Sequence, residues 1–298
     1  MTSYERQAMS DEKDLSIGPG ADSLQRPQTD DSEHGPLGWA MDRTPARVFV
    51  DRCGPAYRTQ TQLQLRADHA CALDAVQDEI DLSRDFATEF MSSRRLFAIQ
   101  SRATDKREFL LRPDLGRQLN DEAKDAISRL CPYGPAVQIV LGDGLSAAAV
   151  VHQVPTLLPC LEEAIRRRGL RLGQTFLVRY CRVGIMNEIG DLLNPEVIVL
   201  LIGERPGLAS AESLSAYLAY RPQSGQTDAQ RNLVSNIHSR GVPVTDAAGR
   251  VAALIDQMRE QRASGIAIKE QLEVLNEAPP WGALNDGSGS GERPADPS

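Results

Sequence analysis

Charged residues follow three hydrophobic segments of the chain, and they are the first candidates for a functional site. The clearest segment, residues 197–202, is apolar at every position and stops at Gly203. Such a run is typical of a strand that is buried on both faces of a parallel sheet. Ligands of open parallel α/β sheets bind beyond the carboxyl ends of the strands. The charged residues at these ends are Asp143, Arg179, Arg182, Glu204 and Arg205.

Carboxylates and arginines that converge at one edge of a sheet can bind a polar ligand through charge-assisted hydrogen bonds. Gly142 and Gly144 would let such a ligand approach the backbone closely. The helix expected after Ser146 would add the positive end of its dipole. The same charged residues could instead form ion pairs that only tie loops together, so the pattern alone leaves both interpretations open.

Residues 142–147 also match the dinucleotide-binding pattern G-x-G-x-x-A. An acidic residue at the end of the following strand normally completes that pattern by binding a ribose hydroxyl. Arg179 and Arg182 occupy this region instead, and arginine would suit a 2′-phosphate better. A stand-alone NAD(P)-binding oxidoreductase is therefore an alternative function.

Composition argues against several other classes of protein. Acidic residues outnumber basic ones, 41 to 33, for a net charge of −8, which argues against non-specific binding to nucleic acid or to a membrane surface. We find no secretory signal and no apolar run near the roughly 20 residues of a membrane span, so we expect a cytoplasmic protein. The four histidines and five cysteines form no metal-ligand or redox motif.

The order of elements predicts an α/β protein with four parts. Residues 1–43 are polar and are expected to form a disordered arm. Residues 44–130 should form a smaller, mainly helical N-terminal region. Strands alternate with helices over residues 131–265, which predicts a Rossmann-like, doubly wound parallel sheet. Residues 266–298 form a C-terminal extension that is expected to be largely a disordered tail.

Several local elements can also be predicted. Residues 109–111 have the pattern of a short extended segment, and one helix is expected over residues 113–130. Pro155 is expected to separate two helices, the second of which covers residues 156–168. Residues 235–238 are polar enough to be expected in a loop.

Seven short groups of residues between Arg58 and Ile266 form a recognisable series. No single group is specific, but their combined order and spacing are. The groups are Arg58-Thr-Gln60 with Ala67-Asp-His69, Arg112-Pro-Asp114 with Gly116-Arg117, Asp143-Gly-Leu-Ser146, Val178-Arg-Tyr180 with Arg182-Val183, Gly203-Glu-Arg-Pro-Gly-Leu208 with Glu212-Ser-Leu-Ser215, Ser235-Asn-Ile-His238 and Ala263-Ser-Gly-Ile266. Together they resemble the small subunit of ethanolamine ammonia-lyase, an adenosylcobalamin-dependent enzyme of bacterial ethanolamine use.

The resemblance implies a light chain that pairs in a hetero-oligomer with a larger barrel subunit. That subunit would hold ethanolamine and carry out its radical deamination to acetaldehyde and ammonia, while adenosylcobalamin lies between the two chains. This chain would supply no catalytic residue and no metal ligand. The family's cofactor contacts map onto Val183, Glu204 and Leu233, the last of which is often cysteine in the family. Three further residues at the same edge of the sheet could support these contacts: Asp143, Arg182 and Arg205.

Two more features bear on the resemblance. Residues 143–146 supply no histidine, so cobalt would receive no histidine ligand from this chain. Relatives packaged in bacterial microcompartments often begin with a short amphipathic helix, whereas residues 1–43 show no helical periodicity. We therefore expect a free cytosolic enzyme, which a fluorescent fusion of residues 1–43 would test. A non-catalytic assembly partner with an empty crevice remains a second alternative function.

Overall fold

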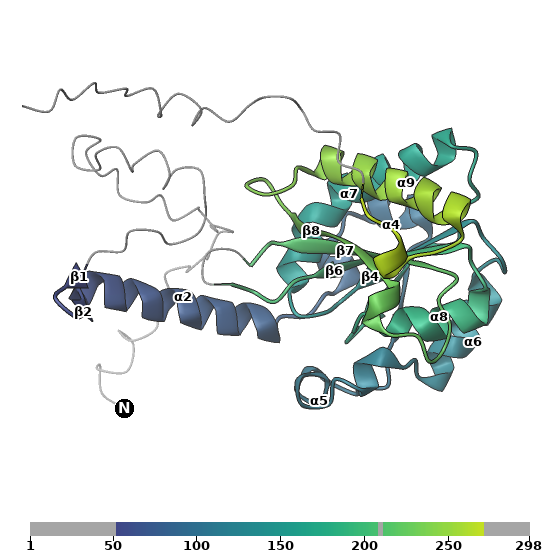
Figure 1. Cartoon of the computed structure of the whole chain (residues 1–298). Helices are drawn as coiled ribbons and strands as arrows, with labels where there is room; N and C mark the ends of the chain where they lie inside the picture. The colour runs from purple at the N-terminus through teal and green to yellow at the C-terminus, as the bar shows by residue number, and fades with distance from the viewer. Residues whose placement is uncertain (1–51, 208–210, 271–298) are drawn as a thin grey trace, which may run out of the picture. The chain divides into compact units, whose positions relative to one another are not determined.

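Six strands form one mixed sheet in the computed structural model, which describes residues 52–207 and 211–270 (Figure 1). Their order across the sheet is β3-β5-β4-β6-β7-β8. The run of apolar residues forms β6, which pairs with β4 on one side and with β7 on the other. The strands are β3 (Phe97–Gln100), β4 (Val137–Gly142), β5 (Phe176–Arg179), β6 (Val197–Gly203), β7 (Leu214–Tyr220) and β8 (Asn232–Ile237).

The α/β class is confirmed, but the sheet is not parallel throughout. Strands β3, β5, β4 and β6 pair in parallel, whereas β7 pairs antiparallel with both β6 and β8. A parallel connection needs a crossover of a dozen or more residues, usually with a helix. Only residues 204–213 join β6 to β7, and residues 221–231 join β7 to β8, so each strand folds back on the one before. Residues 235–237, expected in a loop, belong to β8.

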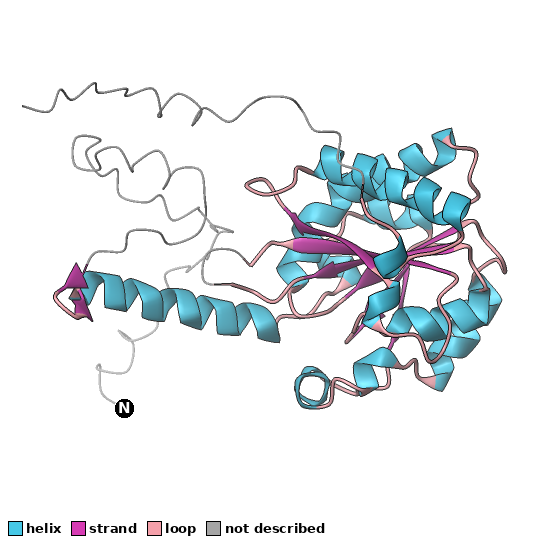
Figure 2. Ribbon diagram, in the orientation of Figure 1, coloured by secondary structure: helices cyan, strands magenta, loops and turns pink. Residues whose placement is uncertain are grey.

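Helices cover both faces of the sheet (Figure 2). Val199 and Leu201 of β6 pack in the cluster formed with α7 and α9, whereas Leu200 and Ile202 pack in the cluster formed with α6 and α8. Every residue of β6 is buried, which explains why the run is apolar at each position. The helices are α6 (Asp121–Leu130), α7 (Ala147–Arg167), α8 (Ile185–Leu193) and α9 (Val244–Gln261).

The expected break at Pro155 is wrong, because α7 continues through both Pro155 and Pro159. A proline inside a helix removes one backbone hydrogen bond and crowds the preceding turn. Pro155 is exposed, so water can bind the carbonyl group that it leaves free. The same helix buries Leu157, Leu158 and Leu161 in the core, and this packing stabilises it against the loss.

Two predictions of local structure before the sheet are also wrong. Residues 109–111 are not extended but belong to α5 (Lys106–Leu111), which Asp105 caps by accepting a hydrogen bond from the backbone. The helix expected from residue 113 begins only at Asp121, because the side chain of Asn120 accepts a hydrogen bond from the first turn of α6 and fixes its start there.

The region expected to be mainly helical, residues 44–130, also supplies strand β3 to the sheet. Its longest helix is α2 (Thr59–Gln77), which has no buried residue and carries Leu63 and Leu73, each 59% exposed. The other elements of the described chain are β1 (Arg52–Cys53), β2 (Ala56–Tyr57), α3 (Leu82–Asp85), α4 (Thr88–Arg94), η2 (Leu115–Arg117), η3 (Asp228–Gln230) and η4 (Gly265–Ala267).

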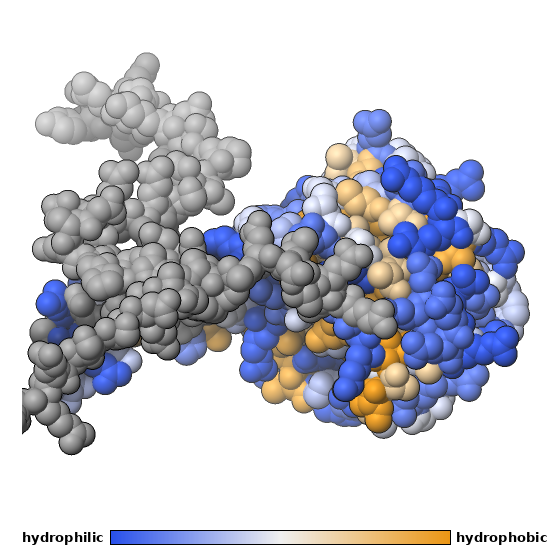
Figure 3. Space-filling model, turned by 45° about the horizontal axis from the view of Figure 1, so that its top comes forward, coloured by the Kyte–Doolittle hydropathy of each residue, from blue (hydrophilic) through white to orange (hydrophobic). Residues whose placement is uncertain are grey.

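The arm expected over residues 1–43, which is also where a targeting helix would occur, lies outside the described residues, and so does most of the expected C-terminal tail. No described helix is both long enough and apolar enough to span a membrane. The visible surface is mostly hydrophilic and is interrupted by separate hydrophobic patches (Figure 3). Patches of this kind can mark sites of interaction with another molecule.

Candidate functional site

Tyr217 of β7 and Leu233 of β8 lie directly opposite each other, so their side chains share one face of the sheet. Leu233 is 43% exposed. Tyr217 is partly buried against the hydrophobic cluster that Val183, just before α8, also contacts. Burial raises the pKa of Tyr217, and the carboxylates of Glu204 and Asp228 raise it further. The structure thus brings the three expected cofactor contacts to the same side of the sheet as Tyr217, which the sequence analysis missed.

Glu204 directly follows β6, and its carboxylate is held in place by two hydrogen bonds. Its Oε1 atom accepts one from the hydroxyl of Ser215 at 2.7 Å and one from the backbone N–H of Asn236 at 2.8 Å. The described residues donate no hydrogen bond to Oε2, and Glu204 is only partly buried. A fixed carboxylate with one available oxygen can accept an N–H group from a ligand.

Asp143 follows β4, but unlike Glu204 it is fully buried, with 0% of its surface exposed. Its Oδ2 atom accepts a hydrogen bond from the backbone N–H of Ile80 at 3.2 Å, and Lys106 Nζ lies 3.6 Å from Oδ1. Burial raises the pKa of Asp143 to about 6, although the ammonium group of Lys106 opposes this shift. Asp143 is therefore enclosed by other parts of the chain and has no surface to offer a ligand.

The side chains of Arg182 and Arg117 each pack against a glycine of the other segment, Arg182 on Gly116 and Arg117 on Gly184. A Cβ atom on Gly116 would lie 2.7 Å from Cγ of Arg182, and one on Gly184 would lie 2.8 Å from Cγ of Arg117. The guanidinium of Arg182 stacks 4.2 Å from the ring centroid of Phe109. Burial lowers the pKa of Arg182, and the nearby positive charges of Arg117 and Arg205 lower it further. These arginines thus share one cationic region.

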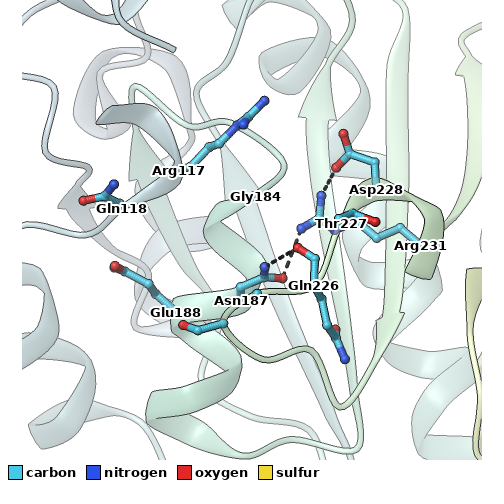
Figure 4. A pocket seen from close by; sticks show the side chains of 11 residues that line it. Arg117, Gln118, Gly184, Asn187, Glu188, Gln226, Thr227, Asp228 and Arg231 are labelled. Atoms are coloured by element: carbon cyan, nitrogen blue, oxygen red, sulfur yellow. Dashed lines mark hydrogen bonds and ion pairs between the residues drawn. The ribbon is translucent and has the colours of Figure 1, made fainter. Parts of the chain in front are cut away.

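A pocket of about 410 Å³ opens at the amino-terminal end of α8, between η2 and the segment that contains η3 (Figure 4). Arg231 lines it with a side chain that is only 4% exposed. This guanidinium forms an ion pair with Asp228 and donates a hydrogen bond to Asn187 Oδ1 at 3.0 Å. Arg117 lines the opposite side. Burial lowers the pKa of Arg231, and the positive charge of Arg117 lowers it further, whereas Asp228 opposes the shift.

The glycines of residues 142–147 are explained by packing and do not support a dinucleotide site. Gly142 and Gly144 are buried, and a Cβ atom on Gly144 would lie 2.7 Å from Cγ1 of Ile202. The side chain of Ser146 caps α7 by accepting a hydrogen bond from the N–H of Ala149 at 3.1 Å. Neither glycine therefore offers exposed backbone to a pyrophosphate, which removes the reason for the oxidoreductase alternative.

Two residues of the candidate site, Tyr217 and Arg231, could not be singled out from the sequence. Tyr217 lies in an ordinary strand pattern, and Arg231 precedes a strand whose second half, residues 235–237, was expected in a loop. The one available signal was for Arg117, which follows Gly116 in a segment that resembles the family. Arg205, by contrast, lies where the sequence predicts it, exposed beyond the end of β6.

The comparison with known proteins agrees with the resemblance seen in the sequence. Residues 36–269 match the family model described as ethanolamine ammonia-lyase light chain. The chain belongs to this family. The ethanolamine ammonia-lyase small subunit of Clostridium perfringens is 41% identical over 227 residues, which cover 76% of this chain and 75% of the relative.

Other small subunits of ethanolamine ammonia-lyase show similar agreement. The one from Clostridioides difficile is 40% identical, with 76% of this chain and 75% of the relative covered. The one from Clostridium acetobutylicum is also 40% identical, and the match covers 76% of this chain and 91% of the relative. The matched region contains all of the described strands, so the site lies in the part of the chain that these light chains share.

Proposed function

We propose that this chain is the small subunit of an ethanolamine ammonia-lyase and forms one side of its adenosylcobalamin site. The complete enzyme would convert ethanolamine to acetaldehyde and ammonia, in complex with a large subunit that holds the substrate. The cofactor supplies the radical that starts such a reaction. The task of this chain would be to bind and orient the cofactor and to keep water away from it.

The residues near Tyr217 fit a cobalamin. A corrin is a wide disc with apolar faces and an edge of amide groups. Leu233 and Val183 offer apolar contacts, and Leu233 is 43% exposed although it lies on a strand of the sheet. Glu204 Oε2 can accept a hydrogen bond from an edge amide, because Oε1 alone satisfies Ser215 and Asn236. This available oxygen on a fixed carboxylate is the observation that most supports the proposal.

The family position that is often cysteine is Leu233 here, so its side chain can make only an apolar contact. Leu233 follows Asn232, whose side chain is occupied by hydrogen bonds to Gly265 and Ile268. The strand is thus fixed, and Leu233 presents its side chain on the same face as Tyr217. We propose that Leu233 contacts the cofactor through its apolar surface alone.

A large-subunit partner is part of this proposal. Exposed Leu63 and Leu73 on α2, together with the exposed Leu233, suit a chain that buries hydrophobic surface against another protein. The described residues contain no cluster of histidine, cysteine and carboxylate side chains that could hold a metal ion. Cobalt is part of cobalamin itself and would arrive with the cofactor, while the large subunit would hold the substrate.

Removing the Glu204 carboxylate tests the proposal. We expect a Glu204→Ala variant of the two-subunit complex to bind cyanocobalamin about tenfold or more weakly, because a hydrogen bond to a charged group contributes about 1.5–3 kcal/mol. Affinity is measured by absorbance titration, and ammonia release by the complex is measured in parallel. Glu204→Gln keeps an acceptor oxygen and should lose less.

Glu163→Ala is the matched control. Glu163 is an exposed glutamate on α7, and within the described chain its side chain pairs only with Arg167. Unchanged cobalamin affinity in Glu204→Ala would contradict the proposed contact. Release of ammonia from ethanolamine by this chain without any large subunit would contradict the proposed division of labour.

A further inference from the structure

Four arginines converge beside the proposed cofactor site. Arg182 and Arg205 are the chain neighbours of Val183 and Glu204, two of the proposed contacts. Arg117 is near enough to Arg182 and to Arg231 that its charge lowers the pKa of both. The four residues are therefore near enough for their charges to interact, and we call them the cationic rim.

This rim has few negative charges to balance it. Within the described chain, Asp228 pairs with Arg231, but no carboxylate forms an ion pair with Arg117, Arg182 or Arg205. The carboxylate of Glu188, which also lines the pocket, accepts a hydrogen bond from the backbone N–H of Leu119 at 2.6 Å. Within the described residues, the mutual repulsion of these three arginines is therefore not offset by an ion pair.

Two of these guanidinium groups also contain buried N–H groups without partners. The Nε atoms of Arg182 and Arg231 are buried and form no hydrogen bond with any described residue. Arg231 is the more enclosed, with its side chain 4% exposed in the wall of the pocket. In Figure 4 the guanidinium of Arg231 is engaged by Asp228 and Asn187, whereas no interaction joins Arg117 to the other side chains drawn. Of the four arginines, Arg117 and Arg231 line the pocket, and unpaired cationic donors at such a place indicate an anionic ligand.

The close packing at the glycines shows that this arrangement is built into the backbone. Because Gly116 and Gly184 have no side chain, the aliphatic parts of Arg182 and Arg117 can pack directly on the backbone there. A Cβ atom at either glycine would be too close to the arginine. The backbone N–H of Arg182 donates to the carbonyl of Gly116 at 2.8 Å and joins the same segments. The amino-terminal end of α8 lies at the same place and adds a favourable dipole for an anion.

We propose that this rim binds the phosphodiester group of the cofactor's nucleotide tail, an inference that rests on the proposed function. The amides at the edge of the corrin are neutral, and the phosphodiester is the one anionic group that cobalamin carries outside its metal centre. A corrin held at Val183 and Glu204 lies directly beside Arg182 and Arg205. Arginine binds phosphate oxygens with two parallel hydrogen bonds, so Arg117 and Arg205 supply the exposed contacts while Arg182 and Arg231 form the wall behind them.

The test compares three ligands on the assembled two-subunit enzyme: cyanocobalamin, cobinamide phosphate, and cobinamide, which lacks both the nucleotide and the phosphate. In Arg117→Ala and Arg205→Ala, we expect affinity to fall about tenfold or more for the two ligands that contain phosphate and to stay unchanged for cobinamide. Arg117→Lys keeps the charge and should lose less. Arg129→Ala, which changes an exposed arginine in the last turn of α6, is the matched control.

Every other outcome overturns the inference. An equal loss for all three ligands would mean that the arginines support the site without contacting phosphate. Unchanged affinity for all three would mean that the rim faces no part of the cofactor. The Arg117 and Arg205 variants could also fail to assemble with the large subunit, which size-exclusion chromatography would detect. That result would mean that the arginines bind carboxylates of the large subunit and not the phosphate. If the unmodified complex binds none of the ligands, the proposed function itself fails, and this result is distinct from the others.

Discussion

Two acidic residues follow neighbouring parallel strands, yet they have different roles. Asp143 after β4 is fully buried, pairs with Lys106 and accepts a hydrogen bond from Ile80. Glu204 after β6 is only partly buried, and its Oε2 atom is available. Both positions lie at the edge where ligands of α/β sheets bind. A position at the end of a strand therefore does not by itself make a carboxylate available to a ligand.

The difference arises from what covers each strand end. Lys106 Nζ donates hydrogen bonds to the carbonyl oxygens of Asp78 and Gly144, and so joins the chain after α2 to the loop after β4. The hydroxyl of Tyr180 lies 3.0 Å from Glu79 Oε2 and adds a second link to the same segment. No such segment of the described chain covers Glu204. The end of β4 has become part of the core, whereas the end of β6 has remained partly exposed.

The comparison predicts its largest effect at Lys106. We expect Lys106→Met to lower the free energy of unfolding by about 3 kcal/mol at pH 8, because it leaves the carboxylate of Asp143 buried without a counter-ion. Adding Asp143→Asn to Lys106→Met should restore most of the loss. Arg205→Ala, which removes an exposed cation beside Glu204, should change stability by less than about 0.5 kcal/mol. Urea denaturation of the full-length chain measures all three, and equal losses in Lys106→Met and Arg205→Ala would contradict the contrast.

A second effect should appear in the dependence of stability on pH. The pKa of Asp143 is raised from 3.8 to about 6 in the folded state. Between these values the folded chain keeps a proton that the unfolded chain has released, so the free energy of unfolding falls as the pH rises through this window. Relative to Asp143→Asn, the unmodified chain should lose at most about 3 kcal/mol from pH 4 to pH 6. Parallel pH profiles of the two proteins would argue against a buried, titrating Asp143.

These contrasts also explain how far the sequence could predict the structure. The burial of β6 follows from its continuous apolar run, and the position of Glu204 follows from the end of that run. The environment of Asp143 could not be predicted, because its partner Ile80 lies 63 residues earlier in the chain. The direction of β7 and β8 depended on the length of their connections and not on any pattern within the strands. Arg231 reached the site only through that reversal.

The smallest effect is expected at Leu233, which tests whether the surface beyond Glu204 contacts the cofactor through apolar atoms. Leu233→Ala should weaken cyanocobalamin binding by the two-subunit complex about threefold to tenfold, because the lost apolar contact is worth about 1 kcal/mol. Leu233→Asp should weaken it further by placing an unpaired charge against the corrin. The stability of the chain should change little, since Leu233 is 43% exposed. Equal affinities in the alanine, aspartate and unmodified proteins would limit the binding surface to Val183 and Glu204.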